Sequence, residues 1–145
     1  MINRLQFSID IQADKEKIWN ALWEDKHYRD WSGVFGEGSH FVVENWKEGN
    51  KIMFLDSDQN GIFSSIEKYI PNKIIQFAHI GTVVNGKEQP LDDDTKKWSG
   101  TTEAYTIIDG LDFCTLLVDI DILDEHIDFM SEKLPIALKK IKENC

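Results

Sequence analysis

The 145-residue sequence has few cysteines and no long hydrophobic run, and each absence excludes a class of protein. Cys114 and Cys145 are its two cysteines, and they fit neither a disulfide scaffold nor a CxxC zinc site. No apolar stretch approaches the roughly 20 residues that a membrane helix needs. The first residues alternate polar and apolar side chains and lack the continuous apolar core of a signal peptide. Together these features predict a cytoplasmic protein.

Basic residues are also scarce, with 16 Lys and Arg against 26 Asp and Glu, and the net charge is -10. This balance argues against partners such as nucleic acid and anionic membranes, which select for clustered Lys and Arg. We interpret the excess negative charge as a solubility feature. The alternative is an acidic face that docks on a basic protein partner.

Several catalytic and metal-binding motifs are absent as well. There is no HExxH, no G-x-G-x-x-G after a strand, no P-loop and no G-x-S-x-G. His27, His40 and His126 have no spacing that supplies three ligands from one element. The acidic run at 92–94 lacks the spacing of a calcium loop, which favours a solvated loop. We expect no metal and no cofactor.

What the sequence does contain is strand alternation, first between Leu5 and Ile11. Two short helices are predicted next, the first capped by Asp14 and the second ending near Trp31–Gly33. Further strands are predicted at His40–Asn45, Asn50–Asp56, Gly61–Ile70, Lys73–Val84, Thr101–Asp109 and Leu111–Leu123. Most of the links between them are short turns, which join antiparallel neighbours. The exception is the polar segment 85–100, which we expect to be a long mobile loop.

The last segment, Asp124–Cys145, has apolar residues at helical spacing, with Pro135 inside the pattern. A proline inside a helix removes a backbone donor and bends the helix. We therefore predict an α+β fold in one domain, 1–145. In it, a curled antiparallel sheet of about seven strands wraps around a long kinked C-terminal helix.

The chain resembles the START-like helix-grip (SRPBCC) superfamily, and within it the type of the activator of heat-shock-protein-90 ATPase homologues. The segments that carry the resemblance are I-W-N-A-L-W-E-D-K-H-Y-R-D-W (18–31), 61–81, 98–107 and K-L-P-I-A-L-K-K-I-K-E (133–143). Leu134 departs from the family, which usually has Trp before this proline. The resemblance implies a ligand held between the sheet and the final helix, whereas fold alone leaves the chemistry open.

Aromatic side chains are the main sign of a cavity. They lie on segments that border the concave side of the predicted sheet: Trp31, Phe35, Phe41, Phe63, Phe77, Trp98, Tyr105 and Phe129. Such residues suit a pocket for a small hydrophobic ligand, and the alternative is that they fill the interior. A bend at Pro135 would also leave an entrance beside Phe129 and Met130.

Three polar residues share strand parity with the inward-facing positions: His79, Glu103 and Tyr105. If they converge, burial would move the carboxyl and imidazole pKa values towards neutrality and permit acid–base catalysis. The alternative is a buried polar network that only orients the helix, or positions on the outer face.

These patterns favour a non-catalytic domain that binds a small hydrophobic or amphipathic molecule, lipid-like or polycyclic. A chaperone-ATPase-activator-like interaction module is the first alternative. A cyclase, dehydratase or isomerase that uses His79, Glu103 and Tyr105 is the second. The protein is expected to be a monomer or a homodimer.

Overall fold

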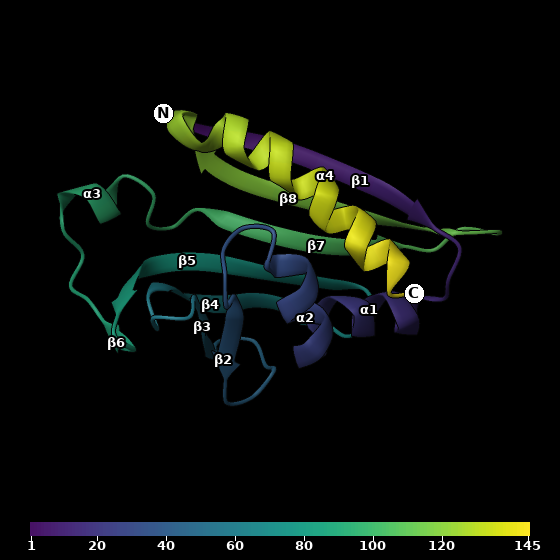
Figure 1. Ribbon diagram of the computed structural model, residues 1–145, viewed down its shortest axis with the longest axis horizontal. Coiled ribbons are helices and arrows are strands. Elements are labelled where there is room, and N and C mark those ends of the chain that lie inside the picture. Colours follow the sequence, from purple (N-terminus) through teal and green to yellow (C-terminus); the bar gives the residue numbers. More distant parts are fainter.

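The computed structural model describes residues 1–145, and its elements follow the predicted order (Figure 1). The strands are β1 (Ile2–Ile11), β2 (His40–Val43), β3 (Lys51–Leu55), β4 (Gly61–Ile70), β5 (Ile74–Val84), β6 (Lys87–Glu88), β7 (Thr102–Ile108) and β8 (Cys114–Leu123). The helices are α1 (Lys15–Trp23), α2 (Asp25–Ser32), α3 (Asp93–Lys96) and α4 (Ile127–Glu143), with a 3₁₀ turn at Asp124–His126 before α4.

All strands belong to one antiparallel sheet in the order β1-β8-β7-β5-β4-β3-β2, and β6 pairs with the end of β5. Neighbours from β2 to β5 are joined by short turns, as predicted. The turns include Gln59 and Asn72 at positive φ. The first strand pairs with the last, because β1 lies along β8 from Ile2↔Leu123 to Ile11↔Cys114. The α+β fold with an antiparallel sheet is thus confirmed.

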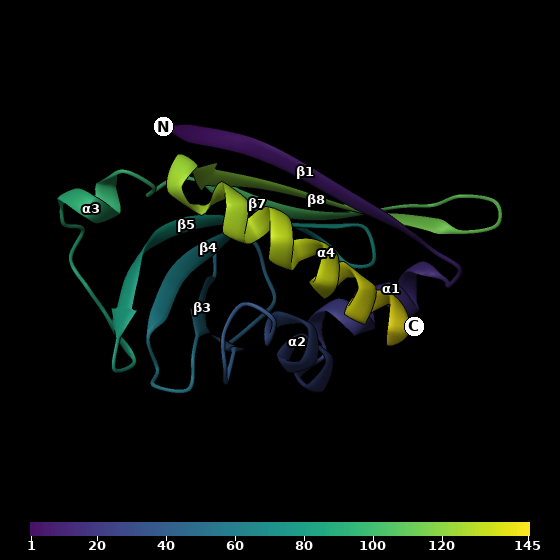
Figure 2. The same ribbon diagram turned by 45° about the horizontal axis from the view of Figure 1, so that its top comes forward.

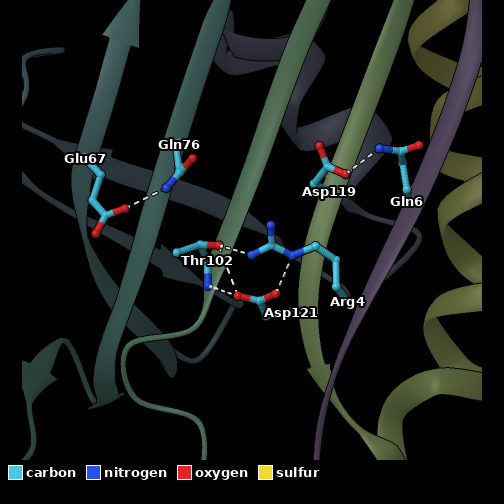
Figure 3. Close-up of polar contacts among 7 residues, drawn as sticks. All are labelled: Arg4, Gln6, Glu67, Gln76, Thr102, Asp119 and Asp121. Carbon is cyan, nitrogen blue, oxygen red and sulfur yellow. Dashed lines mark hydrogen bonds and ion pairs between the residues drawn. The ribbon is translucent and has the colours of Figure 1, made fainter.

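The alternation of side chains gives the sheet an apolar inner face and a polar outer face. In β1 the residues Leu5, Phe7 and Ile9 pack against the main core. Between them, polar side chains bond across strands on the outer face, as Figure 3 shows for Arg4–Asp121 (2.8 Å) and Gln6–Asp119 (2.8 Å). The helices α1, α2 and α4 gather on one side of the sheet (Figures 1 and 2).

The two halves of α4 differ in burial. Its C-terminal half is docked, with Leu134, Ala137, Leu138 and Ile141 buried. The helix α4 contacts α1, α2 and β1. In the N-terminal half Met130 is partly buried and Phe129 is 43% exposed. Pro135 lies inside the helix, next to the point where deep burial begins.

The segment 85–100, predicted as a mobile loop, contains the short elements β6 and α3. Asp92 caps α3, because its Oδ1 accepts from the backbone N–H and the hydroxyl of Thr95, both at 2.8 Å. The same segment places Leu91 near Gly81 and Phe63. A small second core of Leu55, Phe63 and Val83 lies in this part of the sheet.

Candidate functional site

Two main cavities lie beside α4, and the larger of these two, about 370 Å³, lies under the N-terminal half of the helix. Its walls come from α2, from the inner face of the sheet and from α4. The aromatic residues of this wall are Tyr28, Trp31, Phe35, Phe54, Tyr105 and Phe129. The α2 wall is fixed to α1, since the indole N–H of Trp31 donates to the Leu22 carbonyl at 2.9 Å.

A smaller cavity of about 270 Å³ lies beside it, towards the start of α4. His79, Trp98 and His126 are among its lining residues. Four residues line both cavities and so form the boundary between them: Ile62, Glu103, Ile120 and Met130. Glu103 is the only charged one of these four.

A continuous chain of hydrogen bonds surrounds Glu103. His79 Nε2 lies 3.3 Å from one carboxylate oxygen, and the Tyr105 hydroxyl donates to the other. On its far side, His79 Nδ1 lies 2.7 Å from Ser64 Oγ. In the neutral ring, Nε2–H donates to Glu103, and Nδ1 then accepts from the Ser64 hydroxyl; in the charged ring Nδ1–H donates to Ser64 Oγ instead. Tyr105 and His79 thus orient the Glu103 carboxylate directly, and Ser64 orients His79.

The electrostatics keep this carboxylate ionised and the phenol protonated. Burial raises the pKa of Glu103, but the hydrogen bond and charge of His79 and the bond from Tyr105 outweigh it and leave the pKa below its ordinary value. Burial, and then the negative charge of Glu103, raise the pKa of Tyr105 well above its ordinary value. Near neutral pH the site therefore presents a negative charge within apolar walls.

This arrangement predicts an acid-sensitive contribution to stability. The pKa of Glu103 is lower in the folded state, so the protein gains stability above the ordinary pKa of 4.5 and loses it as pH falls through the folded pKa. Urea unfolding should show a free energy of unfolding that decreases from about pH 5 to pH 3. In Glu103→Gln this decrease should be shallower. Glu67→Gln, on the outer face, is the control, and an unchanged slope in Glu103→Gln would contradict the assignment.

Eight of the eleven predicted site residues line one or both of the two cavities. Trp31, Phe35, Glu103, Tyr105, Phe129 and Met130 line the larger cavity. His79 and Trp98 join Glu103 and Met130 around the smaller one.

Three predicted residues line neither cavity. Phe77 is fully buried in the main core, and Phe41 packs on Tyr28, with ring centroids 4.9 Å apart. Phe63 alternates along β4 with Ile62 and Ser64, which face the cavities and His79, so its ring points the other way into the second core.

Sequence reasoning missed Tyr28, Ser32 and Ser64. Tyr28 lies one helical turn before Trp31 on α2, with ring centroids 5.0 Å apart, and this spacing was the available signal. Ser32 follows Trp31 and lines the larger cavity, and its side chain is buried. The pairing of Ser64 with His79 depends on a bulge in the β4–β5 register, and no sequence pattern predicts this bulge.

No three side chains of His, Cys, Asp or Glu converge in a way that would hold a metal ion. None of the helices combines the length and the apolar character that crossing a membrane requires.

Comparison with solved structures identifies proteins of the same architecture. The Aha1 dimer from Colwellia psychrerythraea aligns at 21% sequence identity and a TM-score of 0.67, over 97% of this chain and 94% of that one. Protein MLL2253 from Mesorhizobium loti aligns at 11% identity and a TM-score of 0.73, over 98% and 96%.

DynU16, a protein of the dynemicin biosynthetic locus, aligns at 10% identity and a TM-score of 0.68. The alignment covers 97% of this chain but only 46% of DynU16. No protein-family model and no curated protein matches the chain. At these identities the likeness shows the fold, and this fold is the START-like helix grip that the sequence predicts.

Proposed function

We propose that this helix-grip protein is a non-catalytic binding protein that holds a small hydrophobic or amphipathic molecule between its sheet and α4. The observation that carries the proposal is a cavity with aromatic walls and one oriented carboxylate. Its volume of about 370 Å³ falls within the range of typical ligand sites, about 300–1,000 Å³. Burial of the ligand's apolar body would drive affinity at about 25 cal/mol per Å².

The state of Glu103 favours binding over catalysis. A general base must be free to take a proton from the substrate. Here the hydrogen bonds from Tyr105 and His79 stabilise the ionised carboxylate, and the lowered pKa makes Glu103 a weak base. Ser64, next to His79, is fully buried and lines neither cavity. These groups are better suited to orienting a ligand than to acid–base chemistry by His79, Glu103 and Tyr105.

Native mass spectrometry and NMR titration test the proposal together. The purified protein should carry a small molecule, or should bind the probe 2-naphthylmethanol with 1:1 stoichiometry. The largest amide shifts should fall on the cavity residues Ile62, Ile120 and Leu134, whereas exposed Ile70 should not respond. Absence of a bound molecule and of probe binding up to about 1 mM, an affinity of about 4 kcal/mol, would refute the proposal.

A second candidate is an interaction module of the chaperone-activator type, favoured by the shared fold with the Colwellia Aha1 dimer. It predicts binding to a chaperone ATPase and a raised ATPase turnover. Analytical ultracentrifugation would show whether this protein is a monomer or, like the Colwellia Aha1, a dimer. A pull-down without ATPase stimulation counts against this candidate.

We also propose that residues 1–145 form one domain and that the protein is cytoplasmic. The two free thiols, Cys114 and Cys145, suit a reducing compartment. The test of the location is fractionation of cells that express the chain.

A further inference from the structure

All the ionisable acidic or basic side chains that line the larger cavity are acidic. Glu103 and Asp56 line it, and no lysine, arginine or histidine does. Asp56 is engaged in its own turn, where its carboxylate accepts from the backbone N–H groups of Asp58 and Asn60. The smaller cavity also lacks lysine and arginine. An anionic head group therefore has no Lys or Arg partner in either cavity.

Glu103 retains acceptor capacity for a ligand. An ionised carboxylate has about four lone-pair positions, two on each oxygen. His79 and Tyr105 occupy one position on each oxygen. The side chain is 30% exposed and borders both cavities, so the remaining positions face space that a ligand can enter.

The walls around this carboxylate suit a positive charge. Aromatic rings attract a cation that lies within about 6 Å of the ring centre, because the ring faces are negative. Trp31 and Tyr105 are two of the six rings that line the larger cavity.

From this arrangement we infer that the ligand is an organic amine, bound as its ammonium ion on an aromatic or aliphatic body. The inference rests on the proposed function, because it requires that the larger cavity hold a ligand. The ammonium donates to Glu103, and the apolar body packs against the rings under α4. Fatty acids and phosphate esters are disfavoured, since they bring a like charge to Glu103.

Three matched probes test the inference: 2-naphthylmethylamine, 2-naphthylmethanol and 2-naphthoate, each titrated calorimetrically into the protein at pH 7.5. The amine should bind about tenfold more tightly than the alcohol, as expected for one additional charge-assisted hydrogen bond, and the acid should bind most weakly. Equal or tighter binding of the alcohol or the acid would overturn the amine inference while the proposed function stands. If none of the three binds, the proposed function itself is contradicted.

The variant Glu103→Gln locates the preference. It keeps the shape of the side chain and removes its charge, so the amine should bind it no more tightly than the alcohol does. Glu67→Gln is the matched control, because Glu67 is exposed and accepts from Gln76 on the outer face (Figure 3), and it should keep the tenfold preference. An amine preference that persists in Glu103→Gln contradicts the inference. If this variant does not fold, the relative affinities of the unaltered protein for the amine, the alcohol and the acid still test the inference.

Discussion

Replacing Phe77 with alanine is expected to lower the free energy of unfolding by about 3–5 kcal/mol. Phe77 is fully buried in β5, the middle strand of the seven-strand path. Its ring lies 5.1 Å from Phe54 and 5.6 Å from Trp23, both in edge-on geometry. The truncation removes these contacts and leaves a void that the surrounding rings, attached to separate elements, cannot fill. Urea unfolding followed by circular dichroism measures the loss.

Phe113→Ala provides the matched control for this prediction. Phe113 is 43% exposed, close to the turn between β7 and β8, so the same truncation should cost less than about 1 kcal/mol. Equal losses in the two variants would show that the Phe77 ring does not hold the main core together.

Met130→Trp is expected to weaken the binding of 2-naphthylmethanol by about fiftyfold or more. Met130 projects from α4 and lines both cavities, so a larger ring at this position occupies the space of the probe. Excluding about 100 Å² of apolar ligand surface forfeits about 2.5 kcal/mol of binding free energy. The free energy of unfolding should change little, because Met130 is only partly buried. Calorimetric titration and urea unfolding of the same preparation separate the two effects.

Ile136→Trp is the control on the same helix. Ile136 is 46% exposed and lines neither cavity, so its substitution should leave the dissociation constant within about twofold. If Met130→Trp binds the probe as well as the unaltered protein does, the probe does not occupy the cavities under α4.

Most of the fold follows from two periodicities in the sequence. The alternation of apolar residues from Leu5 to Ile11 predicts β1, and the three- and four-residue spacing after Asp124 predicts α4. Both elements are confirmed. These signals are strong because an element buries only one face, so its apolar residues recur with the period of a strand or of a helix.

The parts that sequence reasoning missed depend on local capping and register. α3 has a single helical turn, too short for periodicity, and it is defined by the Asp92 cap. Phe63 was predicted to face the cavity because it is aromatic, yet alternation with Ile62 and Ser64 turns it outward. Strand parity did place His79, Glu103 and Tyr105 on one face, where the structure brings them together. The additional bond to Ser64 depends on the bulge beside Phe63.

The pairing of β1 with β8 also sets the order in which the protein forms during synthesis. The side chains of Asn3 and Asp124 meet across 121 residues of sequence, so β1 lacks its partner until the ribosome has produced the residues of β8. At about 5–20 residues per second, the nascent β1 waits for several seconds without its partner. The helix α4, which covers the cavity, follows β8 in the chain and therefore docks on a sheet that already has all of its strands.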